Sequence, residues 1–469
     1  MTLEEKISAW MDAHEAEFIR DTARLVAIPS VSGPAAPGAP FGAECRRALD
    51  EAIALCRGYG FETQIYGGAM GSADYNSERA ALDILAHLDV VGPGEGWDSD
   101  PFAARAEGGF LYGRGVDDDK GPFVLALFAM RCLKELGIEL RSGCRLLFGT
   151  HEENGSDDLP YYYSNHAPAA HTFTPDTGFP VYNTEKGDWR IAISRAWPRG
   201  EALPRLESAE GGFRINVVPG DASARIAGLE ARAALAAAAP AAEEYGVGLS
   251  AEDVPGGCEL RVHGRQAHAA APWLGNNAVT ALIGILARLP LEGPAAGALG
   301  SLARFFPHGD WLGEGCGVAM ADGESGPLTL SANILGITPE GLRLDADARV
   351  PLCASEENCP GKLYPALAAA GFSAGGVMER AHHTPPDGGF IRSLLESYER
   401  YTGQKGECRA TGAGTYVHNI PGGVGFGAYM PGFDTRLHGA NERIRVRDAL
   451  TAGKIFALAI AKICEIKED

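Results

Sequence analysis

The pattern that most constrains the fold is an alternation of apolar strand, amphipathic helix and apolar strand in the first third of the chain. Residues 81–86 (ALDILA) and 144–149 (CRLLFG) are short apolar runs typical of buried strands. Between them, residues 121–136 predict a helix that ends before Gly137. This order predicts an α/β fold with a mostly parallel sheet and flanking helices.

The middle of the chain has a different character. Three stretches alternate as antiparallel strands do, and residues 222–245 are Ala-rich with helical character. The alternating stretches are residues 190–194, 259–263 and 342–348. Helices are expected outside this region at residues 3–28, 43–59, 389–402 and 447–466. We therefore expect one α/β domain formed by residues 1–188 and 385–469, interrupted by an inserted α+β lid domain at residues 189–384.

Composition excludes several classes of protein. Of the 469 residues, 45% are hydrophobic and 22% charged, as in globular proteins, and the net charge of −20 argues against nucleic-acid binding. The acidic N-terminus does not read as a signal peptide, and no stretch approaches the roughly 18 apolar residues of a membrane helix. The ten cysteines include no Cys-x-x-Cys pair. We expect a cytoplasmic protein with reduced thiols.

Polar residues follow each apolar strand, where ligands bind in α/β folds. His87 and Asp89 follow the first strand, and His151, Glu152 and Glu153 follow the second. Three carboxylates, Asp117–Asp119, stand between a Gly-rich turn and the helix start. They could cap that helix, since its dipole favours negative charge.

Further candidates are Asp176 after Thr174-Pro175, and His438 in the segment Leu437–Glu442. Each cluster alone has an ordinary structural explanation. Together they offer two imidazoles and several carboxylates, which suits Zn²⁺, with Mn²⁺ or Co²⁺ as alternatives. A shared carboxylate between two ions, which lie roughly 3.5–4 Å apart in such hydrolases, would explain the crowding of acidic residues.

Five motifs in this order resemble those of the co-catalytic zinc peptidases, the family that includes carnosinases, succinyl-diaminopimelate desuccinylases and PepV-type bacterial dipeptidases. The motifs are His87-Leu88-Asp89, Gly113-Arg114-Gly115-x-x-Asp118-Asp119-Lys120-Gly121, Glu152-Glu153-x-Gly155, Pro175-Asp176 and His438-x-x-Asn441-Glu442. The length, the large insertion and the segments 183–187 and 412–416 look most like the PepV branch.

The resemblance implies a role for each matched residue. One metal would be held by His87 and Asp176, the other by Glu153 and His438, with Asp118 between them. Asp89 would orient His87, and Glu152 would be the general base.

The inserted domain carries residues that the resemblance assigns to substrate. His268 would stabilise the oxyanion of the tetrahedral intermediate, and Asn216 and Gly414 would help to bind substrate. Arg349 would bind the free carboxylate of the substrate. Two of these have a structural alternative: His268 as a surface histidine and Arg349 as a strand arginine.

Two positions depart from the family pattern: His151 stands where Asp is usual, and Asn154 where Ser is common. The resemblance implies a metal-dependent dipeptidase acting through metal-activated water. An N-acyl amino acid deacylase or desuccinylase of the same family is the first alternative, and a non-catalytic metal-binding protein the second. We expect small dipeptide substrates, no nucleic-acid or membrane partner, and a monomer, with a homodimer as the alternative.

Overall fold

The computed structural model describes residues 1–467, so the last two residues of the expected segment 385–469 lie outside it. The chain divides into two units. The α/β unit comprises Met1–Thr184, His383–Arg409 and the part of the chain from Thr415 onward, and the inserted unit comprises Glu185–His382 with Ala410–Gly414.

The α/β unit is built on a nine-stranded sheet in the order β1-β2-β6-β3-β7-β24-β9-β22, with β23 also paired to β9. Its strands are β1 (Glu62–Tyr66), β2 (Met70–Asp74), β3 (Ala80–His87), β6 (Gly143–Gly149), β7 (His171–Thr174), β9 (Val181–Glu185), β22 (His382–His383), β23 (Cys408–Thr411) and β24 (Gly423–Gly425). The expected parallel pairing is found in the centre, where β6, β3, β7 and β24 run parallel. Pairing is antiparallel from β1 to β6 and between β24 and β9.

Alternate residues of the central strands enter different cores. Ile84 and Leu146 belong to the main core, whereas Leu85 and Leu147 pack in a smaller cluster with Tyr416. This follows from the two-residue repeat of a strand, and it explains why these strands are apolar without alternation.

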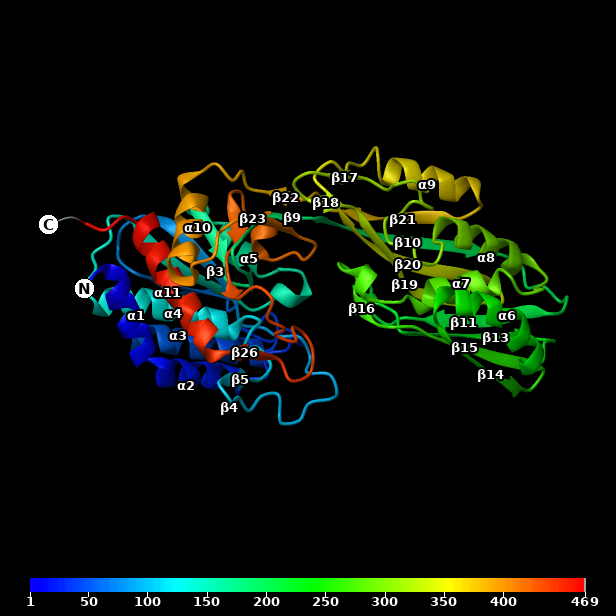
Figure 1. Cartoon of the computed structure of the whole chain (residues 1–469), viewed down its shortest axis with the longest axis horizontal. Helices are drawn as coiled ribbons and strands as arrows, with labels where there is room; N and C mark the ends of the chain where they lie inside the picture. Colours follow the sequence, from blue (N-terminus) through cyan, green and yellow to red (C-terminus); the bar gives the residue numbers. More distant parts are fainter. Residues whose placement is uncertain (468–469) are drawn as a thin grey trace. The chain divides into compact units, whose positions relative to one another are not determined.

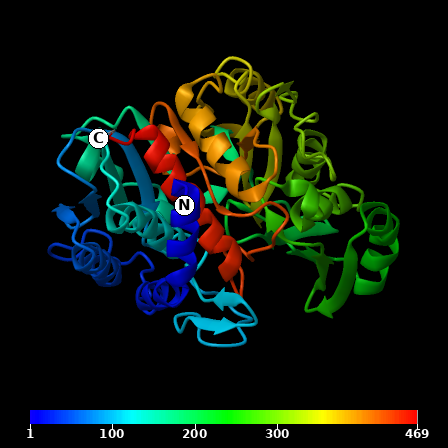
Figure 2. The same ribbon diagram turned by 60° about the vertical axis from the view of Figure 1, so that its left-hand side comes forward.

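Helices cover the sheet. They are α1 (Leu3–Ala13), α2 (Glu15–Val26), α3 (Ala43–Gly58), α4 (Lys120–Glu135), α5 (Leu159–Tyr163), α10 (Gly389–Thr402) and α11 (Val446–Ile463). Helix α11 packs against α4 and α10, and Figure 2 shows α10 and α11 side by side in orange and red. Residues Lys120–Leu133 of α4 are all buried, as expected for a helix enclosed between a sheet and other helices.

Short elements complete this unit. A three-stranded sheet is formed by β4 (Arg105–Glu107), β5 (Phe110–Tyr112) and β26 (Arg443–Arg445), and a two-stranded one by β8 (Thr177–Gly178) and β25 (Ala428–Tyr429). Two 3-10 turns are η1 (Glu152–Asn154) and η3 (Tyr416–Asn419).

The inserted unit has an eight-stranded sheet in the order β14-β15-β13-β11-β19-β20-β10-β21, antiparallel throughout (Figure 1). Its strands are β10 (Gly187–Ala196), β11 (Arg205–Gly211), β13 (Asp221–Ala227), β14 (Gly248–Val254), β15 (Gly257–His263), β19 (Thr329–Thr338), β20 (Gly341–Val350) and β21 (Ser373–Met378). Its helices are α6 (Ala231–Tyr245), α7 (Ala278–Leu286), α8 (Pro294–Phe305) and α9 (Pro360–Ala369). Short pieces are β12 (Val217–Val218), β16 (Ala267–His268), η2 (Pro272–Leu274), β17 (Ala321–Asp322) and β18 (Gly326–Pro327). This unit has its own hydrophobic core.

Two expectations about elements were wrong. The helix expected at residues 3–28 is broken at His14, whose ring stacks on Trp10 and bonds to its carbonyl oxygen at 2.6 Å. The Ala-rich segment 222–245 is not helical throughout, because Asp221–Ala227 is strand β13, paired on both sides. Among the described residues, no helix is long and apolar enough to cross a membrane.

Candidate functional site

The polar clusters found in the sequence meet at one edge of the central sheet. His87 is the last residue of β3 and lies opposite Gly149, the last residue of β6. Strand β7 ends at Thr174, two residues before Asp176. Because these strands are parallel, their carboxyl ends place the following residues side by side.

Two groups of possible metal ligands form there, each with ligand atoms within 4.8 Å of one another. The first is His87, Glu152 and Asp176, and the second is Asp118, Glu153 and His438. All five residues expected to bind metal are therefore among the six brought together. The sixth is Glu152, the residue expected to act as the base.

Asp118 lies between the two histidines. Its Oδ1 is 2.9 Å from Nε2 of His87, and its Oδ2 is 2.7 Å from Nε2 of His438. Nε2 of His87 is also 3.6 Å from Oδ2 of Asp176, and Nε2 of His438 is 3.2 Å from Oε1 of Glu153. A carboxylate that turns one oxygen to each half of a site has the arrangement of a bridging ligand.

Asp89 supports this site in two ways. Its backbone carbonyl oxygen lies 3.0 Å from Nδ1 of His87, whereas the carboxylate, the group expected to orient the ring, is 3.5 Å away. Since a carbonyl only accepts, Nδ1 carries a hydrogen, which leaves Nε2 as the ring nitrogen directed at the site. The Asp89 carboxylate accepts hydrogen bonds from the backbone N–H groups of Glu152 and Glu153 at 3.0 and 3.1 Å.

The chemistry of these side chains fits divalent cations. Nε2 of His87 and Oε1 of Glu153 are buried and make no hydrogen bond among the described residues, although other ligand atoms lie close. Buried polar atoms without partners are costly unless something binds them. Mixed imidazole and carboxylate donors suit zinc and similar ions.

Burial disfavours negative charge on the carboxylates of this site. It raises the pKa of Glu152 well above its usual range. Burial is also the main reason that the pKa of Glu153 is raised to about 7 and that of Asp176 to about 6, and the charge of Asp118 adds to both shifts. A cation in the site would oppose all three shifts.

The pKa values of His87 and His438 are also raised, but for another reason. Burial lowers their pKa, but close carboxylates outweigh it, so that the pKa of His438 is raised to about 11. The pKa of His87 is likewise raised well above its usual value. Without metal, the close carboxylates therefore favour the protonated form of both rings, and a metal ion must displace such a proton to bind.

The residues expected to bind substrate lie in the inserted unit. Asn216 and His268 are close together, because Val217 pairs with His268 and the carbonyl oxygen of Asn216 accepts from N–H of Ala269 at 2.9 Å. His268 is exposed, and its Nδ1 accepts from N–H of Ala270 at 3.0 Å. Gly414 is exposed with open space around its Cα.

Arg349 is buried on β20 and already has a carboxylate partner. Its Nε and Nη2 donate to the two carboxylate oxygens of Asp347 at 2.8 and 2.9 Å. Of the guanidinium nitrogens, Nη1 is outside this bidentate pair. A substrate carboxylate would have to approach from the Nη1 edge or share the fork.

Several residues support the site although the sequence predicted no role for them. Asp158 accepts hydrogen bonds from the N–H groups of Thr150 and His151 at 2.5 and 2.9 Å, and from the Tyr416 hydroxyl. Oδ2 of Asp119 accepts from N–H of His87 at 3.0 Å. A single sequence gives no signal for Asp158, because the residues it holds are defined only by the folded loop.

His151, the unusual neighbour of Glu152, belongs to neither ligand group. Its ring stacks on Phe41 with centroids 4.0 Å apart. Its Nδ1 lies 3.7 Å from the exposed carboxylate of Asp157.

Comparison with known proteins relates this chain to a family of peptidases. Residues 84–462 match the family model described as "Peptidase family M20/M25/M40". The chain is 30% identical to the YtjP protein of Bacillus subtilis (strain 168), covering 96% of this chain and 97% of that one. It is 27% identical to the Beta-Ala-Xaa dipeptidase of Lactobacillus delbrueckii subsp. lactis, covering 97% and 98%.

The family model matched by this chain is that of a peptidase, and the two ligand groups could each hold a metal ion. The chain belongs to peptidase family M20/M25/M40, which confirms the resemblance predicted from the motifs. The fold is shared with human carnosine dipeptidase 1, with a TM-score of 0.63 at 16% identity over 99% of both chains. It is also shared with the di-peptidase Dug1p of Saccharomyces cerevisiae, with a TM-score of 0.60 at 12% identity over 98% of both chains.

Proposed function

We propose that this protein is a metal-dependent dipeptidase that hydrolyses the single peptide bond of small dipeptides. The observation that carries the proposal is the position of Asp118, with one carboxylate oxygen at each histidine of a buried site. The name of the Lactobacillus relative, a Beta-Ala-Xaa dipeptidase matched over nearly its whole length, supports the substrate class.

In the proposed site, one ion would be held by His87 and Asp176, the other by Glu153 and His438, with Asp118 shared. When bound, two divalent ions lower the pKa of water and polarise the scissile carbonyl. Zinc is our first choice, with manganese or cobalt as alternatives.

Glu152 is proposed as the general base. It would take a proton from the attacking water and deliver it to the leaving amine. Its backbone is fixed through the bond from N–H of Glu152 to Asp89. Glu152 also lies within one of the two ligand groups, so base and ligand are alternative roles that the variants below separate.

The inserted unit is proposed to bind the substrate. His268 would donate a hydrogen bond to the oxyanion, with Asn216 and Gly414 beside the substrate backbone. Arg349 would bind the free carboxylate, which in a dipeptide lies at a fixed distance from the only peptide bond. A tripeptide would move that carboxylate by roughly 3.3–3.6 Å, so one arginine would select for length as well as charge.

The test is a substrate panel with Zn²⁺, Mn²⁺ and Co²⁺ in turn. It would compare L,L-, D,L- and β-Ala dipeptides with tripeptides and with N-acetyl and N-succinyl amino acids. We expect the highest kcat/KM on a dipeptide. A preference for N-acyl substrates would reject the proposal in favour of a deacylase built on the same site.

A further inference from the structure

Two proposed ligands come from segments far apart in the sequence. Asp118 lies in the Gly-rich loop before α4, and His438 lies in the segment between β25 and β26. Neither segment is a strand or helix at the ligand itself. Something other than regular secondary structure must therefore fix the distance between the two side chains.

A buried ion pair joins the two segments. Nη1 of Arg114 lies 2.5 Å from Oε2 of Glu442, and the exposed fractions of the two side chains are 1% and 0%. Arg114 belongs to the Gly-rich loop and Glu442 to the C-terminal segment. Neither residue is in the two ligand groups.

Glu442 holds the backbone of the Gly-rich loop. Its Oε1 accepts hydrogen bonds from three backbone N–H groups, those of Gly115 at 3.0 Å, Asp117 at 2.9 Å and Asp118 at 3.3 Å. Successive N–H groups directed at one carboxylate form an anion-binding turn. Glu442 thus fixes the backbone of Asp118, whose carboxylate lies between the two histidines.

Arg114 fixes the backbone of the other ligand, His438. Its Nη2 donates to the carbonyl oxygens of His438 at 3.1 Å and Gly439 at 3.2 Å. His438 has φ 59° and Asn441 has φ 58°, in the left-handed region that non-glycine residues seldom adopt. Such conformations persist only where the surroundings enforce them, and the Arg114 bonds to the two carbonyl oxygens hold the turn at His438.

We propose that Arg114 and Glu442 are positioning residues that set the separation of Asp118 and His438 and thereby the affinity for both metal ions, above all for the ion at Glu153 and His438, which we call the second ion. The inference rests on the proposed metal site. Arg114 acts mainly on the half that contains His438, whereas Glu442 acts on both halves through Asp118. The fork of an arginine is needed, because one guanidinium bonds to Glu442 and to the turn at the same time.

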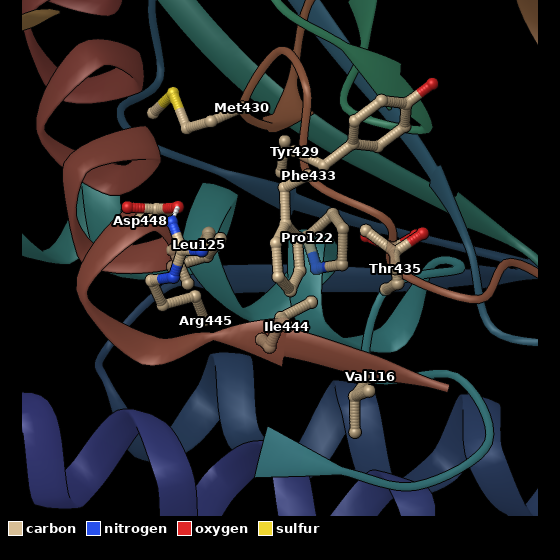
Figure 3. A pocket seen from close by; sticks show the side chains of 13 residues that line it. Val116, Pro122, Leu125, Tyr429, Met430, Phe433, Thr435, Ile444, Arg445 and Asp448 are labelled. Carbon is tan, nitrogen blue, oxygen red and sulfur yellow. Dashed lines mark hydrogen bonds and ion pairs between the residues drawn. The ribbon is translucent and has the colours of Figure 1, made fainter. Parts of the chain in front are cut away.

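Other contacts between the same segments should let conservative variants fold. Figure 3 shows Pro122 and Leu125 close to Phe433 and Ile444 around a small pocket, which Val116 also lines. This apolar packing does not depend on the ion pair. Arg114→Lys keeps the charge, and Glu442→Gln keeps the size and an acceptor oxygen.

The first experiment titrates the metal-free full-length variants with Co²⁺ and follows both affinity and the visible absorption of the bound ion. Arg114→Lys should bind the first ion as the unchanged protein does and the second roughly 10- to 100-fold more weakly, with an altered spectrum. Glu442→Gln should weaken both ions. Arg131→Lys and Asp83→Asn are matched controls, a largely buried arginine and a buried aspartate outside the site, and should leave Co²⁺ binding unchanged.

The second experiment uses the unchanged protein, so it does not depend on variants that fold. Hydrogen exchange at the N–H groups of Gly115, Asp117 and Asp118 should already be slow in the metal-free protein, because the Glu442 carboxylate holds these three groups without metal. Fast exchange until the second ion binds would overturn the proposal. So would variants that bind two Co²⁺ ions with unchanged affinity and spectrum. Neither result depends on turnover, so a protein that binds two ions but hydrolyses no dipeptide would contradict only the proposed function.

Discussion

At the residue scale, the adjacent residues Glu152 and Glu153, which follow the end of β6, are predicted to have different roles, one in proton transfer and one in metal binding. Both backbone N–H groups are held by the carboxylate of Asp89. Glu153 lies 3.2 Å from His438, whereas Glu152 groups with His87 and Asp176. The sequence predicted that the pair would divide between proton transfer and metal binding, and that division stays a prediction.

Glu152→Gln should therefore retain two metal ions while kcat falls by roughly 10²–10⁴-fold, because an amide cannot accept the proton. Glu153→Gln is the control and should lose an ion. The measurements are metal content after dialysis and kcat on a dipeptide. If Glu152→Gln loses metal and Glu153→Gln keeps it, the two roles are reversed.

The raised pKa values of the two histidines predict proton release on metal binding. A pKa of about 11 means that His438 is protonated at pH 7 in the metal-free protein, and the raised pKa of His87 favours the protonated form of that ring too. Metal binding should expel these protons, so affinity should rise with pH until the solution approaches the pKa. Calorimetry in buffers of different ionisation enthalpy measures the protons released. Binding without net release at pH 7 would disprove these assignments.

At the element scale, the apolar strands and α4 were predicted well because each is an apolar run that ends at polar residues or at glycine. Strand β6 and helix α10 were found where expected. The break at His14 was missed because the apolar spacing continues across it, while the side-chain bond to Trp10 that accompanies it leaves no mark in periodicity. Strand β13 was missed because alanine favours helices, and pairing with two neighbours outweighs that preference.

Gly121, at the start of α4, should not tolerate a methyl group. A Cβ there would lie 1.9 Å from the carbonyl oxygen of Val116, in the loop that carries Asp118. Helix propensity alone would favour alanine by about 1 kcal/mol, but the clash should reverse the sign and cost roughly 1–3 kcal/mol.

Urea unfolding of Gly121→Ala measures this cost. Gly297→Ala is the control, because Gly297 lies in α8 with open space around it and should become slightly more stable as alanine. If both substitutions change the free energy of unfolding equally, the loop around Val116 can move to accommodate the methyl group without loss of stability.

At the scale of the whole molecule, the chain combines two units with separate hydrophobic cores. The metal ligands could be proposed from the sequence because each lies in a motif that resembles one of the family's motifs. The supporting contacts could not, since Asp158, Arg114 and Glu442 act through backbone groups that only the folded chain brings together. The roles of the inserted unit in substrate binding remain predictions.

Arg349→Ala tests whether the inserted unit recognises the substrate carboxylate. It should lower kcat/KM on free-acid dipeptides by on the order of 2–5 kcal/mol of transition-state binding, and affect amidated dipeptides much less. Arg343→Ala is a matched control on the same strand, since Arg343 pairs with Asp345 in the same way but is 71% exposed. Equal losses on free-acid and amidated substrates would leave Arg349 as the structural partner of Asp347.

In the proposed function, dipeptide hydrolysis needs two metal ions that share Asp118. The most direct measurement adds Zn²⁺ stepwise to the metal-free protein and records kcat/KM on a good dipeptide substrate at each ratio, with Asp118→Ala beside it. We predict that activity reaches its maximum only when two ions are bound, and that Asp118→Ala binds one ion or none and is inactive. Full activity with a single bound ion, or two tightly bound ions in Asp118→Ala, would contradict the account.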